Sequence, residues 1–261
     1  MEFKNKIITA AFILILAAQL IFSQESENYN YVISPYSIQL NLCLNNSLME
    51  LSGSGSISEN IYNGKTFGAG KGFGAAVISK ISFGRKSSFR FNQSVSYNRI
   101  LSYDFDKTQY DIGEAYYNAF TLALGTEYNF SPARRYIFFI GAELNAGLIN
   151  GHSKIWFERR GHPLGDSVAK YEFNSSIRMG YGLIFGAEYL INNQFSINTG
   201  IKFQNLNAFI KQSEGTNENA EFQIRDEDSP GLIFAGNKNF ALMSYCLGLS
   251  LNFGSNSRNL K

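Results

Sequence analysis

Residues 36–44 read Tyr-Ser-Ile-Gln-Leu-Asn-Leu-Cys-Leu, and apolar and polar side chains alternate along the whole stretch. Successive side chains of a β-strand point to opposite faces, so this order predicts a strand with one apolar and one polar face. In the stretch 67–83, which has the same period, the apolar face carries Phe67, Ala69 and Phe73. The pattern also recurs in 89–101, 116–130, 136–148, 177–189, 195–203 and 243–253. The sequence therefore predicts an all-β protein of eight strands.

Strands of this kind fit two architectures, which differ in the environment of each face. A soluble sandwich buries the apolar face, whereas a membrane barrel turns that face to lipid and the polar face to its interior. The polar face here is mostly Gly, Ser and Asn with few charges, which suits a narrow interior. Most stretches reach the roughly 9–11 residues that a tilted strand needs to cross a bilayer, and aromatic residues cluster near their ends. These features favour the membrane barrel.

The connections between the predicted strands alternate in length. Three are tight turns, at 84–87, 131–135 and 191–194. Four are long, near 45–65, 102–114, 150–173 and 206–238. Short turns at one end and long loops at the other are typical of outer-membrane barrels. We therefore expect a closed antiparallel transmembrane β-barrel with up-and-down topology.

The composition of the 261 residues agrees with this interpretation. Only 17% of the side chains are charged, against about 25% in average soluble domains, yet the mean hydropathy is slightly negative at −0.14. The net charge is +2 and no dense run of Lys and Arg occurs, so nucleic acid is not an expected partner. Two cysteines exclude a disulfide-dense scaffold and a multi-cysteine zinc site.

The N-terminus has the order of a secretory signal peptide. Lys4 and Lys6 precede an apolar run from Ile7 to Phe22, and the small residue Ser23 follows. This order predicts a signal peptide over 1–23 that is cleaved on export; the alternative is a retained anchor helix. The predicted barrel then covers 24–253, and 254–261 form a short C-terminal tail.

Residues 34–253 resemble the family of small eight-stranded outer-membrane β-barrels of the OmpA/OmpX type. A Gly-x-Glu-Tyr phrase occurs at 125–128 and again at 186–189, each time before a short turn. Residues 246–253, Cys-Leu-Gly-Leu-Ser-Leu-Asn-Phe, are similar to the terminal signal that the outer-membrane assembly machinery reads. Cys246 departs from the usual polar first residue, and the tail follows Phe253 where many members end. The resemblance implies a protein of the Gram-negative outer membrane, in contact with its lipids and lipopolysaccharide and with the assembly machinery through Cys246–Phe253.

Seven charged residues fall on the inward face of the predicted barrel, and their signs nearly balance. They are Lys80, Arg90, Arg178 and Lys202 against Glu127, Glu143 and Glu188. Counted from the tight turns, Arg90 and Glu127 lie at about the same height, as do Lys80 and Glu188, and Glu143 and Lys202 share a layer further up. Buried charges need partners, so we expect a salt-bridged plug. The alternative is a constricted ion path with these residues as its selectivity lining.

Cys43 and Cys246 lie on the first and last predicted strands, which become neighbours when the barrel closes. Both point inward, and both lie at a similar distance from the end with short turns. Either they form a disulfide across the closing seam, which the oxidising periplasm permits, or they are two small interior residues without a bond.

Two cations fall on the outward face near the long-loop end. Lys71 and Arg99 belong to adjacent strands at nearly the same height. They either hold phosphate groups of lipopolysaccharide or snorkel their charges into the polar interface.

The predicted loops contain few residues that could indicate catalysis or metal binding. Both histidines, His152 and His162, lie in the third long loop, and the acidic run 226–228 lacks the spacing of a calcium loop. Ile155-Trp156-Phe157, with Phe173 across the loop, fits a hairpin that continues the barrel above the membrane. We expect no catalytic, metal or cofactor site, and a structural or surface-binding role through the external loops. The alternatives are a channel for small solutes or hydrophobic compounds and an enzyme that modifies lipid A.

Overall fold

The computed structural model describes most of the predicted barrel. The described residues are 34–52, 67–83, 88–102, 111–130, 135–157, 168–209, 224–225, 234–235 and 239–254. The predicted signal peptide 1–23, His162, the acidic run 226–228 and the tail beyond Gly254 lie outside them.

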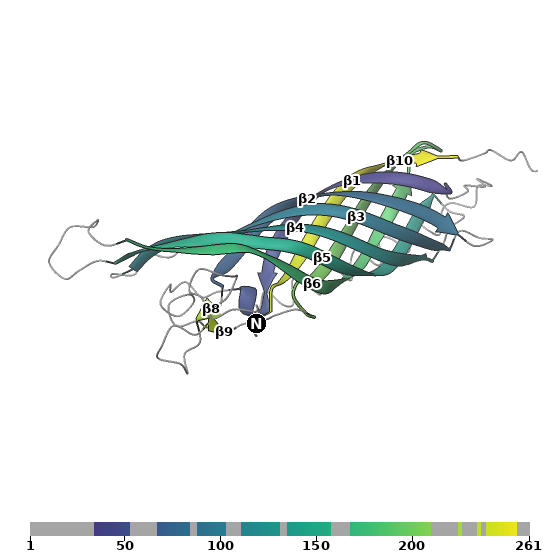
Figure 1. The fold of residues 1–261 in the computed structure, drawn as a ribbon. Coiled ribbons are helices and arrows are strands. Elements are labelled where there is room, and N and C mark those ends of the chain that lie inside the picture. The colour runs from purple at the N-terminus through teal and green to yellow at the C-terminus, as the bar shows by residue number, and fades with distance from the viewer. Residues whose placement is uncertain are drawn as a thin grey trace, which may run out of the picture. The chain divides into compact units, whose positions relative to one another are not determined.

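Eight antiparallel strands close a barrel, as predicted (Figure 1). The strands are β1 (Tyr36–Leu48), β2 (Ala69–Phe83), β3 (Phe89–Ser102), β4 (Asp111–Asn129), β5 (Tyr136–Phe157), β6 (Val168–Leu190), β7 (Phe195–Asn205) and β10 (Ala241–Phe253). Their order around the barrel is β1-β10-β7-β6-β5-β4-β3-β2, so neighbours in the barrel follow one another along the chain. The first and last strands, β1 and β10, pair to close the ring. The up-and-down topology is confirmed.

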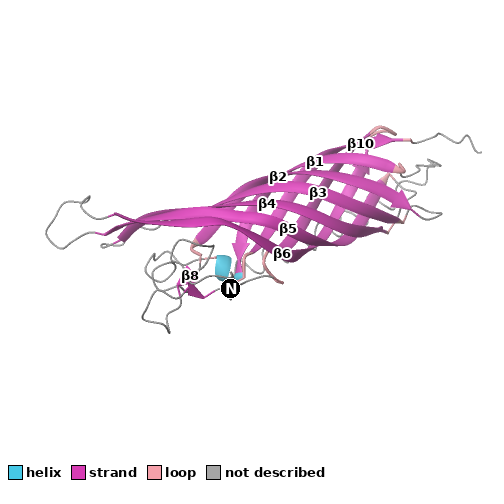
Figure 2. Cartoon of the chain, in the orientation of Figure 1, coloured by secondary structure: helices cyan, strands magenta, loops and turns pink. Residues whose placement is uncertain are grey.

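Three short elements lie outside the barrel wall (Figure 2). The 3-10 turn η1 (Met49–Leu51) follows β1, and β8 (Ile224–Arg225) pairs with β9 (Phe234–Ala235) in a small two-stranded sheet. Within the described ranges, no helix is long and apolar enough to cross a membrane.

The two faces of the wall have opposite character. Along β1, exposed and buried residues alternate, so that Leu42 is 67% exposed whereas Asn41 is 6% exposed. The other strands repeat this pattern with Leu, Ile, Val, Phe and Tyr outside and Ser, Asn, Gln and charged residues inside. This is the reverse of a water-soluble fold, in which apolar side chains fill the interior.

The structure corrects the predicted orientation of Phe67 and Ala69. The pairing of β2 with β3 shifts between Ala69, opposite Ser102, and Gly72, opposite Ile100, which is a β-bulge. Phe73 is exposed, as expected, but Phe67 and Ala69 are buried in the barrel interior. The prediction that all three share the outward face is therefore wrong, because the bulge breaks the period of two.

Three strands continue past the rest of the barrel at the end with the long loops (Figure 1). Pairing of β4 with β5 extends to Asp111 opposite Phe157, and pairing of β5 with β6 to Trp156 opposite Val168. In contrast, β3 pairs with β4 only as far as Tyr116, and β7 pairs with β6 only as far as Tyr181. The expected hairpin above the barrel is confirmed, and these strands are longer than predicted.

Candidate functional site

The interior near the short turns holds a network of four charged side chains. Lys80 Nζ lies 3.0 Å from Glu127 Oε2, and Arg90 Nη1 lies 3.1 Å from Glu127 Oε1. The same Arg90 nitrogen lies 2.6 Å from Glu188 Oε2. Arg90 and Glu127 are paired across β3 and β4, whereas Lys80 and Glu188 come from β2 and β6. The network therefore crosses the lumen from wall to wall.

Neutral groups complete this network. Asn92 Nδ2 donates to Glu127 Oε2 at 3.2 Å, and Ser196 Oγ donates to Glu188 Oε1 at 2.5 Å. Lys80 Nζ also lies 4.6 Å from the centre of the Phe139 ring, a favourable cation–π geometry. Both carboxylates thus have several donors, which buried charges require.

A second ion pair lies further along the lumen. Lys202 Nζ is 2.5 Å from Glu143 Oε1, and Gln204 Nε2 donates to the same oxygen at 3.4 Å. A cavity of about 40 Å³ adjoins both residues and also touches Lys80, Glu127 and Cys246. Since roughly 10–15 Å³ is already enough to admit one water, this cavity has room for water but not for a larger molecule.

Arg178 belongs to neither group. It is buried on β6, opposite Gly147 of β5, and its Nη1 donates to the carbonyl of Ile177 at 3.4 Å. The structure therefore distributes the seven predicted charges as a network of four, a pair, and Arg178.

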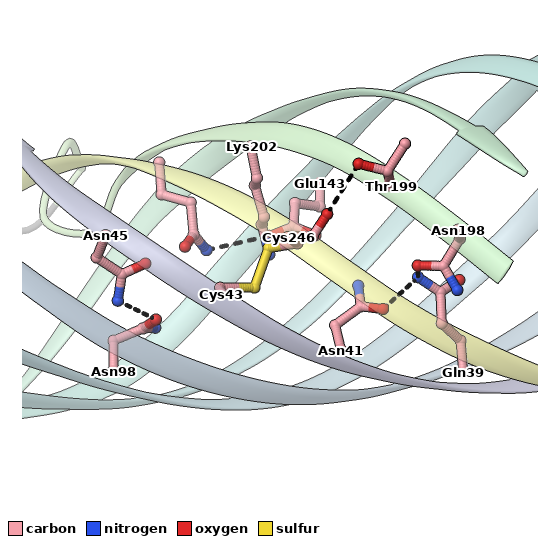
Figure 3. Close-up of a disulfide and its surroundings, with 11 residues drawn as sticks. Gln39, Asn41, Cys43, Asn45, Asn98, Glu143, Asn198, Thr199, Lys202 and Cys246 are labelled. Carbon is pink, nitrogen blue, oxygen red and sulfur yellow. Dashed lines mark hydrogen bonds and ion pairs between the residues drawn. A yellow bond between two sulfur atoms is a disulfide. The ribbon is translucent and has the colours of Figure 1, made fainter.

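A disulfide joins Cys43 to Cys246 inside the lumen, across the β1–β10 seam (Figure 3). Amide side chains lie on both sides of it along the lumen. Gln39 Nε2 donates at 2.7 Å to Asn41 Oδ1 and, at the same distance, to Asn198 Oδ1. On the other side, Asn45 Nδ2 donates to Asn98 Oδ1 at 2.9 Å.

An apolar cluster fills the lumen at the long-loop end, and sequence reasoning missed it. We call it the apolar cap; it consists of Leu51, Phe67, Ala69, Ile100, Ala115, Tyr117, Ala119, Ile149, Leu206, Phe240 and Leu242. The ring of Phe240 lies 5.7 Å from that of Phe67 and 6.1 Å from that of Tyr117, and the Tyr117 hydroxyl donates to the Phe67 carbonyl. Two loops thus fold toward the interior, since Leu51 and Phe67 belong to the β1–β2 connection and Leu206 and Phe240 to the β7–β10 connection. A signal was present, since Ile100, Tyr117 and Ile149 fall on the otherwise polar face.

A ladder of polar side chains crosses the outer face of four strands. The Tyr97 hydroxyl donates to Asn118 Oδ1 at 2.9 Å, and Asn118 Nδ2 donates to Asn150 Oδ1 at 3.0 Å. Asn150 Nδ2 in turn donates to Ser175 Oγ at 3.3 Å. Apolar side chains such as Phe120 are exposed on the short-turn side of this polar ladder. The ladder therefore forms a polar band across the outer face of β3, β4, β5 and β6.

Lys71 and Arg99 lie close to this level. Lys71 is exposed on β2, opposite Asn46 of β1, and Arg99 on β3 is opposite Phe73. The guanidinium of Arg99 lies 4.6 Å from the centre of the Tyr116 ring. The stacked ring holds the Arg99 charge in a fixed position near the outer rim.

His152 is the predicted loop histidine that the structure describes. His152 lies on β5 and packs edge-on against Tyr116, with ring centres 3.9 Å apart. No group of three or more His, Cys, Asp or Glu side chains that could hold a metal occurs in the described residues.

An exposed apolar outer face around a buried polar lumen defines a class of protein. In a bilayer every backbone polar group must be paired within the protein, and a closed barrel satisfies this condition without an edge. The fold and its interior are those of a transmembrane β-barrel of the small, eight-stranded outer-membrane kind.

The chain has similarities to known proteins in sequence family and in fold. A family model described as Opacity family porin protein matches residues 114–225. No curated protein matches the sequence. Among solved structures, Neisserial surface protein A (NspA) is 14% identical, with 84% of this chain and 98% of that chain covered and a TM-score of 0.44. Ail of Yersinia pestis is 11% identical, with coverage of 85% and 100% and a TM-score of 0.41. The outer membrane protein OprG from Pseudomonas aeruginosa is 9% identical, with coverage of 88% and 100% and a TM-score of 0.44.

Proposed function

We propose that this protein is a non-conducting barrel of the Gram-negative outer membrane that binds a surface partner through its extended strands. The observation that carries the proposal is the closure of the described lumen at both ends. The network of Lys80, Arg90, Glu127 and Glu188 crosses it near the short turns, and the apolar cap fills it near the long loops. An ion needs a continuous hydrated path, whereas the interior of an eight-stranded barrel is only wide enough for its own side chains to fill.

The binding surface in this proposal is the outer edge of β6. From Val168 to Ile177, β6 pairs with β5 on one side, and none of the described residues pairs with its other side. An unpaired edge presents alternating N–H and C=O groups that another extended chain can pair with. The partner we propose is therefore an extended polypeptide segment that adds a strand to β6.

Conductance measurements test the closed lumen. The refolded protein, reconstituted in a planar bilayer, is expected to show no steady current steps. A steady conductance whose ion preference changes in Glu143→Gln would instead establish the channel alternative, because Glu143 lines the cavity.

A trimmed hairpin tests the β6 edge. Deleting 152–156 together with 168–172 removes five opposed rows and keeps the barrel and the residues between β5 and β6. Random-peptide selection on the full chain in nanodiscs is expected to yield peptides that do not bind the trimmed variant. Backbone N-methylation of these peptides should abolish binding, since strand addition depends on main-chain hydrogen bonds. If no peptide distinguishes the two proteins, the edge is not the binding surface.

We also propose that Lys71 and Arg99 bind phosphate groups of lipopolysaccharide. They lie diagonally across β2 and β3 at the outer rim, and a Cβ on Gly72 between them would collide with the Arg99 backbone, so the strands approach closely here. Long side chains at diagonal positions reach a common ligand, and charged hydrogen bonds to phosphate are strong.

Thermal unfolding in detergent micelles tests this contact. Bisphosphorylated lipid A is expected to stabilise the native chain but not the Lys71→Gln, Arg99→Gln double variant. Arg135→Gln is the matched control, because Arg135 lies 4.7 Å over the Tyr189 ring at the opposite end of the barrel. Equal stabilisation of the double variant, or of the native chain by dephosphorylated lipid A, would point to ordinary snorkelling.

A further inference from the structure

The disulfide joins the one pair of neighbouring barrel strands that the chain order separates. Cys43 of β1 lies directly opposite Cys246 of β10, and 203 positions separate them in the sequence. Every other neighbouring pair in the barrel is formed by strands that follow one another along the chain. The two sulfur atoms therefore come into register only when the ends of the chain meet.

The bond lies in the middle of the seam. Seven rows separate it from the row of Tyr36 and Phe253 at the short-turn end, and five rows from the row of Leu48 and Ala241 at the other. Glycine occupies both flanking positions, since Gly74 lies opposite Cys43 and Gly200 lies opposite Cys246. A Cβ on Gly74 would lie 2.3 Å from Asn98 Oδ1 and 3.2 Å from Asn45 Nδ2, so the lumen beside the disulfide is tightly filled.

Large reagents cannot approach these sulfurs in the closed barrel. The cavity that Cys246 adjoins has a volume of about 40 Å³, which admits water but not a protein or glutathione disulfide. On the short-turn side, the way to this cavity crosses the network around Glu127, and on the other side it crosses the apolar cap. From outside, the wall is a continuous ladder of paired backbone between β1 and β10.

The chemistry of disulfide formation requires such an approach. One cysteine thiolate attacks a sulfur of the oxidant's disulfide, which forms a mixed disulfide and releases the first oxidant thiolate. The second cysteine thiolate then attacks the chain's own sulfur in the mixed disulfide, which forms the Cys43–Cys246 bond and releases the oxidant as its second thiolate. Two electrons pass to the oxidant, and the two protons of the cysteines end on its two thiols.

We infer that a periplasmic thiol–disulfide oxidant forms this bond before the barrel closes. The mixed disulfide places the oxidant covalently on Cys43 or Cys246, and the closed lumen has no room for it. Oxidation therefore acts on the exported, unclosed chain. The outer-membrane assembly machinery then receives a chain whose first and last strands are already linked by the disulfide. One of the two linked strands, β10, carries the predicted terminal signal.

A pulse–chase experiment in cells tests this order. Thiols are alkylated with a maleimide polymer at each time point, and closure is followed as the faster, heat-modifiable band on an unheated gel. The disulfide is expected to appear before the heat-modifiable band. A closed band with two free thiols that later becomes oxidised would overturn the inference. The double variant Cys43→Ser, Cys246→Ser gives the alkylation background.

Refolding from the reduced chain is the second test. The reduced chain is refolded into lipid vesicles, the reductant is removed, and oxidised glutathione is added. If it closes, oxidation is expected to be at least about 100-fold slower than in the same chain in denaturant, because exchange needs access to the sulfur. If it does not close whereas the oxidised chain and the Cys43→Ser, Cys246→Ser variant close under the same conditions, closure with free thiols is blocked, which also supports the inference. Rapid oxidation of the closed, still heat-modifiable barrel would refute it.

Discussion

Replacing Glu127 by glutamine should destabilise the barrel strongly, because this carboxylate connects the two cations of the network. It accepts from Lys80 Nζ at 3.0 Å, from Arg90 Nη1 at 3.1 Å and from Asn92 Nδ2 at 3.2 Å. The glutamine keeps the shape and one acceptor oxygen but removes the negative charge. Arg90 retains Glu188 at 2.6 Å, whereas Lys80 loses the only carboxylate within salt-bridge distance among the described residues.

The expected size follows from burial. The Lys80 and Glu127 side chains are 4% and 1% exposed, so solvent hardly screens the charge that remains. Breaking a buried ion pair from one side costs about 3–5 kcal/mol, and we expect Glu127→Gln to lower the free energy of unfolding by this amount. Glu143→Gln should cost less, because its partner Lys202 is 14% exposed.

Equilibrium unfolding in guanidinium chloride, in lipid vesicles, measures both variants. Circular dichroism follows the loss of strands, and the heat-modifiable band follows barrel closure. A double-mutant cycle with Lys80→Met separates the pair from the rest of the network. Removing both charges should cost clearly less than the sum of the single changes, since the double variant leaves no unpaired charge on this pair.

Two results would refute this reasoning. One is a stability of Glu127→Gln within about 0.5 kcal/mol of the native chain, the range of ordinary surface substitutions. The other is strict additivity of the two single changes. Unchanged stability together with an altered conductance would favour the ion path over the salt-bridged plug.

Three further predictions concern the apolar cap and the seam, each measured by the same unfolding assay. Phe240→Ala leaves a cavity in the apolar cap and should cost about 3–5 kcal/mol; a loss below 1 kcal/mol would mean that the cap is loosely packed. The double variant Cys43→Ser, Cys246→Ser should be less stable than the native, disulfide-bonded chain by up to about 5 kcal/mol, the loop-closure value for the separation of the two cysteines. Equal stability of the two chains would show that the disulfide does not constrain the unfolded chain. Gly248→Ala places a Cβ against the β1 backbone and should cost about 1–3 kcal/mol. Gly200→Ala, whose nearest backbone contact is 3.0 Å, should cost less, and the reverse order would refute the steric argument.

Much of the wall could be predicted from the sequence because a membrane imposes a simple rule on each strand. Lipid on one side and a narrow polar lumen on the other enforce a strict period of two, so the eight strands and their faces follow from the sequence. Tight turns fix the register between consecutive strands. For this reason Arg90 could be placed opposite Glu127 by counting from the turns, and the structure pairs these residues.

The errors lie where that rule stops. Beyond the polar ladder β4, β5 and β6 continue as a sheet without the other barrel strands, and the sequence predicts these three strands shorter than they are. Next to Ala69 a bulge adds one residue to β2. The alternation that holds for the rest of β2 therefore assigns Phe67 and Ala69 to the wrong face. The apolar cap joins residues from η1, from the five strands β2, β3, β4, β5 and β10, and from segments beside them. No local pattern predicts that loop residues such as Leu51 and Phe240 meet inside the barrel.

The extended strands also determine how far the protein reaches from the membrane surface. From Asn150 of the polar ladder to Phe157, β5 continues for seven residues, a length of about 24 Å at 3.4 Å per residue. With a strand tilt of about 40°, this length gives a height of about 18 Å. The headgroup layer on each side of a bilayer is only about 5–8 Å thick. With the protein in the outer membrane as proposed, this height carries the tip of the three-stranded sheet clear of the lipid headgroups, within reach of large molecules outside the cell.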